Sequence, residues 1–118
     1  MAGIKEKLRL FNKVRDWEQF HTPENLAKSI SIEAAELLEC FQWNNEYNIH
    51  TVSDEVADIV MYCIIFADKV NIDLKKEILR KLALMANLNY RILIWVCNTI
   101  IIIIAKSTNQ TLMNYGNI

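Results

Sequence analysis

Four acidic residues in two similarly spaced pairs are the part of this sequence best suited to chemistry. Glu33 and Glu36 stand three apart, and so do Glu55 and Asp58. Residues three apart lie on the same side of an α-helix, so each pair presents two carboxylates in one direction. If two antiparallel helices carry the pairs, the four carboxylates meet. Such a cluster repels itself, and a hard divalent cation such as Mg²⁺ or Mn²⁺ turns the repulsion into binding.

Each pair taken alone is also typical of a solvated helix face. The apolar stripe beside the first pair consists of Ile30, Ala34, Leu37 and Phe41. Glu39 lies nearly opposite this stripe and is expected in solvent, whereas Glu33 and Glu36 lie near its edge. The second pair flanks a similar stripe of Val56, Val60, Cys63 and Ala67. Spacing therefore leaves two hypotheses open: a cation site, and the solvated acidic face of a non-catalytic helical binding module.

The elements that position these acids are expected to be helices. With two glycines and one proline, the 118-residue chain has too few turn residues for a sheet protein, so we predict one all-α domain. The predicted helices run from about residue 4 to 20, from 23 to 41 or 43, from 51 or 53 to 70, and from 74 onward. Thr22 is the expected N-cap of the second helix, and Thr51 or Ser53 that of the third.

The C-terminal part of the chain has a different character. Residues 92–105 form an apolar run of about 14 residues, shorter than the roughly 20 that span a bilayer. We expect a buried helix or an oligomer contact there. A membrane anchor and an irregular tail are alternatives, and the five consecutive isoleucines in the run also allow a strand.

Composition restricts the kinds of partner that the chain can bind and indicates the cellular compartment in which it is expected. A formal net charge of −1 offers no basic surface for a nucleic-acid polymer. Cys40, Cys63 and Cys97 are odd in number and lie in apolar segments, which indicates reduced core thiols of a cytoplasmic protein. The first ten residues lack the apolar run of a signal peptide, in line with that location. Since the chain has two histidines, a metal site has to rely on oxygen ligands.

The residues around the acid pairs resemble a known family. The segments RDWEQFHTPENLAKSI, EAAELLECFQW and SDEVADIVMYC are similar to the MazG-type, all-α nucleoside triphosphate pyrophosphohydrolases, in particular to their dCTP pyrophosphatase branch. The resemblance covers residues 14–82, and from about residue 85 to 118 the chain diverges. It implies an enzyme that cleaves a nucleoside triphosphate, expected to be a deoxynucleotide, to the monophosphate and pyrophosphate. The implied role is house-cleaning of the nucleotide pool.

The resemblance also implies roles for individual residues. The implied Mg²⁺ ligands are Glu33, Glu36, Glu55 and Asp58, with Mn²⁺ as a substitute ion, and Glu33 or Glu36 is expected to orient the attacking water. The implied nucleotide-binding residues are Trp17, His21, Trp43 and Tyr62, with Lys28 and Lys81 as further candidates for phosphate contacts. Relatives pair their bundles, so a homodimer or homotetramer is expected to complete the fold. Base preference, the strictness of deoxyribose selection and the number of metal ions stay open.

Overall fold

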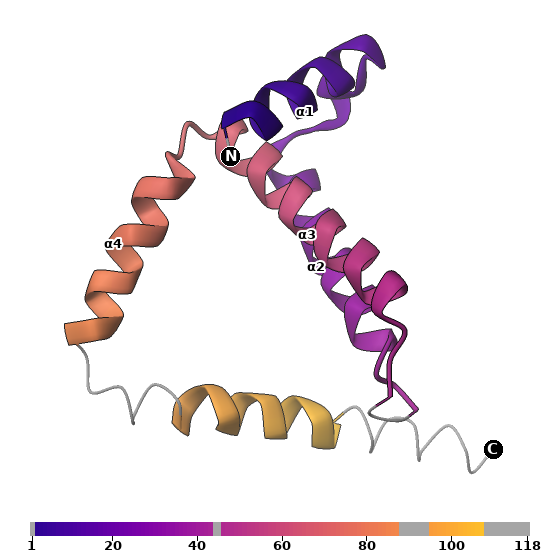
Figure 1. The fold of residues 1–118 in the computed structure, drawn as a ribbon, viewed down its shortest axis with the longest axis vertical. Coiled ribbons are helices and arrows are strands. Elements are labelled where there is room, and N and C mark those ends of the chain that lie inside the picture. Colours follow the sequence, from indigo (N-terminus) through magenta and orange to yellow (C-terminus); the bar gives the residue numbers. More distant parts are fainter. Residues whose placement is uncertain (1, 44–45, 88–94, 108–118) are drawn as a thin grey trace. The chain divides into compact units, whose positions relative to one another are not determined.

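The computed structural model describes residues 2–43, 46–87 and 95–107. The regular elements in these ranges are all helical, as the sequence predicts. In chain order they are α1 (Ala2–Val14), the 3₁₀ helix η1 (Trp17–Phe20), α2 (Pro23–Glu39), α3 (Ile49–Lys69) and α4 (Leu74–Asn87), followed by a helix over residues 95–107 (Figure 1). The chain divides into two units, Met1–Leu74 and Lys75–Ile118. All four acids of the two pairs lie in the first unit.

α2 and α3 form an antiparallel pair of helices that pack side by side (Figure 1). α2 begins as predicted, because Thr22 Oγ1 accepts a hydrogen bond from the backbone N–H of Asn25 at 3.1 Å. Pro23 occupies the first turn, where its missing N–H leaves no hydrogen bond unmade. α2 ends at Glu39, a little before the predicted end at residue 41 or 43.

The predicted N-cap of the third helix is wrong. α3 is capped by Asn48, whose Oδ1 accepts hydrogen bonds from the backbone N–H groups of His50 at 2.9 Å and Thr51 at 3.4 Å. Asparagine caps a helix at least as well as serine or threonine, so the earlier residue starts the helix. Thr51 and Ser53, the predicted caps, therefore lie inside its first turns.

The first helix is shorter than predicted. α1 ends at Val14, and Trp17 belongs to the separate helix η1. Between them Asp16 has φ 54°, in the left-handed region that interrupts a helix and that aspartate tolerates better than most residues. Trp17 consequently lies outside α1, although the predicted first helix included it. Its ring packs edge-on against Phe11, with the two ring centroids 5.6 Å apart.

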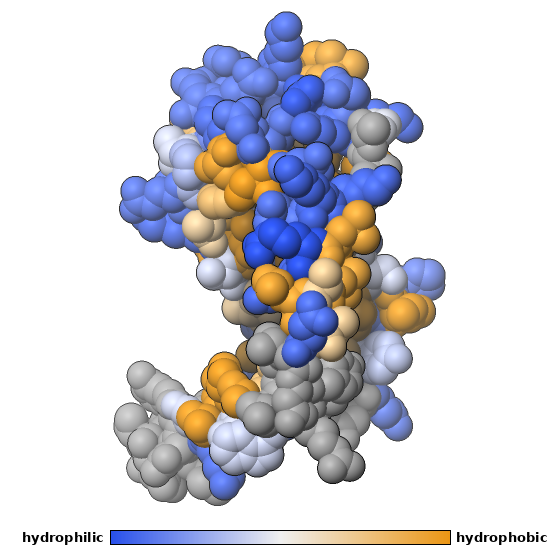
Figure 2. Space-filling view, turned by 90° about the vertical axis from the view of Figure 1, so that its left-hand side faces the viewer, coloured by the Kyte–Doolittle hydropathy of each residue, from blue (hydrophilic) through white to orange (hydrophobic). Residues whose placement is uncertain are grey.

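The apolar core among the described residues is small. Leu26, Ile64 and Ala67 are its buried apolar side chains. The predicted stripes are covered only in part: Ile30, Leu37 and Cys63 are half-buried, while Ala34, Phe41, Val56 and Val60 are exposed. Many apolar side chains therefore reach the surface, as the orange areas of Figure 2 show. A single copy of the chain leaves apolar helix surface uncovered.

The apolar C-terminal segment is helical over residues 95–107, so the strand alternative is wrong for this range. Intrinsic β preference is weak without a neighbouring strand to pair with. The side chains of Trp95 and of the isoleucines at 100–104 are exposed. No helix within the described ranges is both long and apolar enough to cross a membrane. Residues 92–94, the start of the predicted run, lie outside the described residues.

The three cysteines are free thiols, as predicted. Cys40 and Cys63 are half-buried. Cys97, on the helix over residues 95–107, is exposed.

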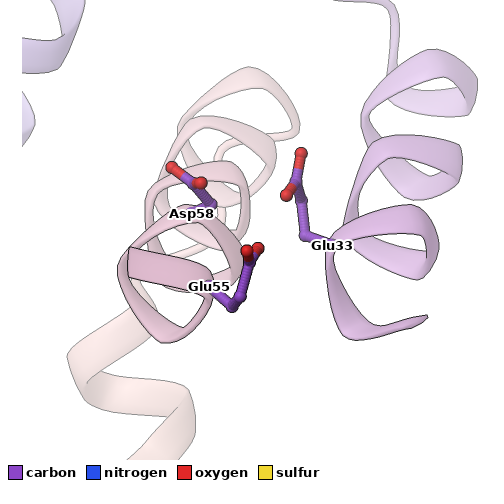
Figure 3. A group of neighbouring side chains, drawn as sticks. All are labelled: Glu33, Glu55 and Asp58. Atoms are coloured by element: carbon purple, nitrogen blue, oxygen red, sulfur yellow. The ribbon is translucent and has the colours of Figure 1, made fainter. Parts of the chain in front are cut away.

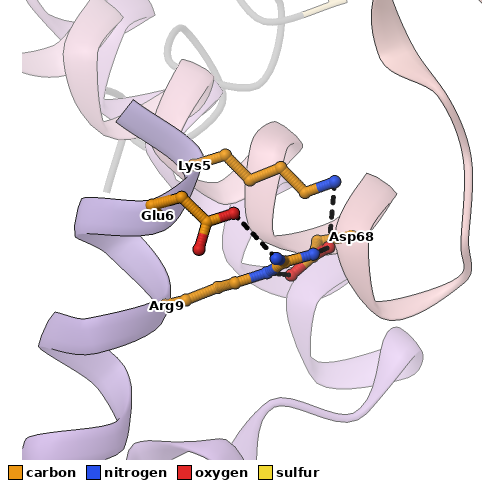
Figure 4. Close-up of polar contacts among 4 residues, drawn as sticks. All are labelled: Lys5, Glu6, Arg9 and Asp68. Atoms are coloured by element: carbon orange, nitrogen blue, oxygen red, sulfur yellow. Dashed lines mark hydrogen bonds and ion pairs between the residues drawn. The ribbon is translucent and has the colours of Figure 1, made fainter. Parts of the chain in front are cut away.

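Charged side chains join α1 to the C-terminal end of α3 (Figure 4). Arg9 Nε donates to Asp68 Oδ2 at 2.7 Å, and the guanidinium also donates to Asp68 Oδ1. Lys5 Nζ lies 3.3 Å from Asp68 Oδ1, and Arg9 Nη1 lies 2.9 Å from Glu6 Oε1. The hydrogen bonds from Arg9 lower the pKa of Asp68 to about 2, and Lys5 contributes to the shift. This bidentate ion pair links α1 to α3.

Replacement of Asp68 by Asn is expected to destabilise the fold by about 1 kcal/mol at neutral pH, a modest loss because the pair is partly exposed. The carboxylate has a lowered pKa, so its contribution is complete above its ordinary pKa of 3.8 and is lost as the pH falls through about 2. Urea unfolding of wild type and Asp68→Asn should therefore differ at pH 7 and converge toward pH 2. Glu46→Gln, at an exposed acid, is the control. Equal midpoints for wild type and Asp68→Asn at pH 7 would show that the pair does not stabilise the fold.

Candidate functional site

Three carboxylates from α2 and α3 meet at one place. Glu33 of α2 faces Glu55 and Asp58 of α3, and one carboxylate oxygen of each lies within 4.8 Å of the others. Figure 3 shows the three side chains directed into the same space between the two helices. All three are half-buried. Ligands on opposite sides of one Mg²⁺ are about 4.2 Å apart, so these oxygens need little movement to share a cation.

Glu36 lies close to this group and is more exposed to solvent. Burial raises the pKa of Glu33 and of Glu55, and the negative charge of Glu36 is the next cause at both. Asp58 adds to the repulsion at both carboxyls. Glu33 and Glu55 are thus held against the negative charges of Glu36 and Asp58, and no cation among the described residues reverses the shift. A bound divalent cation would relieve this repulsion.

Glu55 gives a second, independent indication of a missing partner. Its Oε2 is buried and forms no hydrogen bond with any part of the chain that the structure describes. A buried carboxylate oxygen without a partner is unfavourable, because its hydration is lost and nothing replaces it. A cation between α2 and α3 would provide that partner. The donor set consists of carboxylate oxygens, which fits a hard ion such as Mg²⁺ or Mn²⁺.

The position of each acid on its helix explains why some of the acids meet and another faces solvent. Glu33 and Glu36 stand within one turn of α2, and the antiparallel packing of α3 brings Glu55 and Asp58 opposite them. Glu39, the third acid of α2, is exposed as predicted. The position of each acid relative to the packing seam therefore decides which of them can share a cation.

The aromatic and histidine candidates differ in how much surface they offer. Trp43, just after α2, is 84% exposed, and Trp17 in η1 is 45% exposed, so both indoles present free ring surface. Tyr62 is half-buried and follows Asp58 by one turn of α3. His21 is half-buried between η1 and α2, and its pKa is lowered, mainly by burial and then by the charge of Lys69. His21 is therefore neutral at pH 7.

The two lysine candidates have different surroundings. Lys28 Nζ lies 3.1 Å from Glu24 Oε1, one turn earlier on the exposed side of α2. Such a pair contributes only a few tenths of a kcal/mol, so a phosphate can compete for the lysine. Lys81 is an exposed residue of α4, which belongs almost entirely to the second unit.

One polar region of the first unit, at the contact of α1 with α3, was not predicted from the sequence spacing. The buried Asn12 and the ion pair of Arg9 with Asp68 lie at the contact of α1 with α3. A signal for it was present, because Lys5, Arg9 and Asn12 follow one another at helical spacing on the same side of α1. The partner on α3 is 59 residues away from Arg9 and could not be inferred from that spacing.

Comparison with known proteins places the chain in a family. Residues 28–92, more than half of the chain and including all four acids, match the MazG-like family. The dCTP pyrophosphatase 1 of Rattus norvegicus is 30% identical and that of Homo sapiens 32% identical over 82 residues, and each match covers 61% of this chain and 48% of the relative. The chain thus spans about half the length of these curated relatives. A solved pyrophosphatase from Archaeoglobus fulgidus shares 37% identity and a TM-score of 0.67, over 70% of this chain and 85% of that one. The chain belongs to the MazG-like family and has its all-α fold.

Proposed function

We propose that this chain is a Mg²⁺-dependent nucleoside triphosphate pyrophosphohydrolase, which converts its substrate to the monophosphate and pyrophosphate. The observation that carries the proposal is the group of Glu33, Glu55 and Asp58, with carboxylate oxygens within 4.8 Å of one another. The names of the relatives, dCTP pyrophosphatase 1 and pyrophosphatase, support this reaction class. A deoxynucleoside triphosphate is the proposed substrate, and removal of non-ordinary or surplus nucleotides the proposed role.

The bound cation would neutralise charge on the phosphate oxygens and lower the pKa of water, which is the chemistry that Mg²⁺ supplies to phosphoryl transfer. Glu33, Glu55 and Asp58 would hold it from two packed helices, and a rigid helical base keeps such ligands in place. Glu36 is exposed beside them, so its carboxylate can accept a hydrogen bond from the attacking water. We therefore assign the orientation of that water to Glu36 in preference to Glu33.

The nucleoside is proposed to contact Trp17, His21, Trp43 and Tyr62. The exposed indoles of Trp17 and Trp43 offer ring faces on which a base can stack. The neutral imidazole of His21 can donate one hydrogen bond and accept another. Tyr62 follows Asp58 by one helical turn, which suits a contact with the sugar and, in a close fit, disfavours a ribose 2′-hydroxyl. Lys28 and Lys81 remain proposed phosphate contacts.

We also propose that further copies of the chain complete the fold as a cytoplasmic homodimer or homotetramer. Apolar side chains on both long helices are exposed in the single chain, Ile32 at 57% and Leu38 at 58% on α2, and Val56 and Val60 at 43% each on α3. A chain of 118 residues with so few buried apolar residues gains stability when a second copy covers such surface.

The reaction is tested by incubating the protein with each deoxynucleoside triphosphate and Mg²⁺ and separating the products by anion exchange. We expect the monophosphate and pyrophosphate in equal amounts, and no turnover in EDTA. Release of orthophosphate would contradict cleavage between the α and β phosphates. An absence of hydrolysis with every nucleotide would favour the alternative, a non-catalytic helical binding module with a solvated acidic face.

A further inference from the structure

The indole of Trp17 has two side-chain neighbours at the junction of α1 and η1. The rings of Phe11 and Trp17 meet edge-on, with an interplanar angle of 73°. The guanidinium of Arg15 lies over the Phe11 ring, with its Cζ 3.5 Å from that ring centroid and 5.9 Å from the centroid of Trp17. Both arrangements are attractive, because a ring edge and a cation each bring positive charge to an aromatic face. Phe11, Arg15 and Trp17 therefore form one cluster.

Little else among the described residues orients Trp17. η1 has four residues and none of them is buried, so core packing does not hold it. Its link to α1 passes through Asp16, which has a left-handed backbone. Gln19 Nε2 donates to the backbone oxygen of Asp16 at 3.0 Å and to its Oδ2 at 2.9 Å, and these hydrogen bonds stay within the turn. The direction of the indole consequently depends on its contacts with Phe11 and Arg15.

Arg15 is itself held beside the aromatic rings. Its Nη1 donates to the backbone oxygen of Phe11 at 3.3 Å, in the last turn of α1. The negative end of the helix dipole favours a cation at that position. No ion pair joins Arg15 to an acid within the ranges that the structure describes. Arg15 therefore contacts the aromatic rings and not the acids of the candidate metal centre.

We infer that Arg15 is a positioning residue for the nucleobase and acts through Trp17. The inference rests on the proposed function, in which the Trp17 indole stacks on the base. Trp17 is 45% exposed, so its neighbours cover part of the indole and leave part of it open to a ligand. An indole that is already ordered loses less side-chain entropy on binding than one that turns freely. The base consequently binds more tightly when Arg15 holds the indole.

A deoxynucleoside triphosphate with a methylene bridge between the α and β phosphates tests the inference, because the enzyme cannot hydrolyse this bridge. In calorimetry with Mg²⁺, Arg15→Gln should weaken binding of this analogue about fivefold, the effect of ordering one side chain on binding. Arg15→Lys keeps a cation but not the planar guanidinium, so it should weaken binding about twofold. The matched control is Lys13→Gln, which removes the same charge from an exposed residue in the last turn of α1 and should bind as wild type does.

Inorganic tripolyphosphate with Mg²⁺ separates positioning of the base from a direct phosphate contact, because this ligand has no base. Its affinity should be equal in wild type and Arg15→Gln. An equal loss for tripolyphosphate and for the nucleotide analogue would overturn the inference and make Arg15 a phosphate-binding residue. Unchanged affinity of Arg15→Gln for the nucleotide analogue would overturn it as well.

Fluorescence of the nucleotide-free protein gives a readout that needs no ligand. The chain has three tryptophans, so replacement of Trp43 and Trp95 by Phe leaves Trp17 as the one reporter. In this background Arg15→Gln should lower the fluorescence anisotropy of Trp17 and raise its quenching by acrylamide, because the indole becomes more mobile. Values equal to those with Arg15 intact would contradict a positioning role.

The turnover of natural deoxynucleoside triphosphates is measured separately. A wild type that binds the analogue but cleaves no deoxynucleoside triphosphate would refute the proposed activity, while weaker binding in Arg15→Gln would still support the positioning role. Normal turnover together with unchanged affinity in Arg15→Gln would refute the positioning role alone. The two proposals can therefore fail independently.

Discussion

Glu55→Gln should slow pyrophosphate release by at least about 100-fold, because loss of even an outer-shell partner of a metal ligand reduces metal affinity or activity about 10- to 100-fold. Glu55 is half-buried beside Glu33 and Asp58, and its Oε2 has no hydrogen-bond partner among the described residues. Glutamine keeps the shape of the side chain but removes the charge that would bind the cation. A coupled pyrophosphate assay at saturating Mg²⁺ measures the effect.

The matched control for this variant is Glu39→Gln, at an exposed acid of α2. Its rate should stay within about twofold of wild type, since an exposed charge outside the cluster contributes little. In EDTA at pH 7.5, Glu55→Gln should unfold at a higher temperature than wild type, because it removes a charge that burial and Glu36 disfavour. Equal activity of Glu55→Gln and Glu39→Gln would remove Glu55 from the proposed metal site.

The affinity for Mg²⁺ should fall as the pH is lowered from 7.5 toward 4.5. Burial, followed by the charge of Glu36, raises the pKa of Glu33 and Glu55 above the ordinary value of 4.5. Protons therefore compete with the cation at pH values where an exposed glutamate is fully ionised. In the metal-free protein, repulsion in the cluster destabilises the fold above these raised pKa values and is relieved as the pH falls through them toward 4.5.

Calorimetry in two buffers that differ in ionisation enthalpy measures both the affinity and the protons released on Mg²⁺ binding. We expect release of protons near the raised pKa values, and an affinity that drops by up to about tenfold per pH unit for each proton displaced. Glu33→Gln should show little Mg²⁺ binding at any of these pH values. An affinity that is constant over this pH range, with no proton release, would mean that the cation does not meet Glu33 and Glu55.

Much of the fold could be predicted from local signals. Thr22 followed by Pro23 is a strong helix start, and α2 begins there. The scarcity of glycine and proline correctly indicated helices throughout the described ranges. The break at Asp16 was missed because it depends on one residue in a left-handed conformation, which aspartate adopts in some contexts and not in others. Apolar periodicity indicated the stripes of α2 and α3 but not how far the chain covers them, since Leu37 and Cys63 are half-buried whereas Val60 is exposed.

The acid cluster was accessible to sequence reasoning for a geometric reason. Two pairs at three-residue spacing on consecutive antiparallel helices can meet, although spacing alone also allowed a solvated face, and the structure brings Glu33, Glu55 and Asp58 together. Spacing did not separate the exposed Glu36 from these three, because that difference depends on the packing of α3 against α2. The ion pair of Arg9 with Asp68 was not accessible, since its partners lie 59 residues apart in the chain.

Turnover of dCTP in H₂¹⁸O, followed by mass spectrometry and ³¹P NMR of the products, tests the proposed activity most directly. Hydrolysis of the α–β anhydride, assisted by Mg²⁺ at the acid cluster, predicts dCMP and pyrophosphate with one ¹⁸O atom incorporated per turnover, and the labelled product identifies the phosphorus that water attacks. It also predicts no products in EDTA and almost none with Glu55→Gln. Formation of dCDP and orthophosphate, or turnover that persists without a divalent cation, would contradict the account.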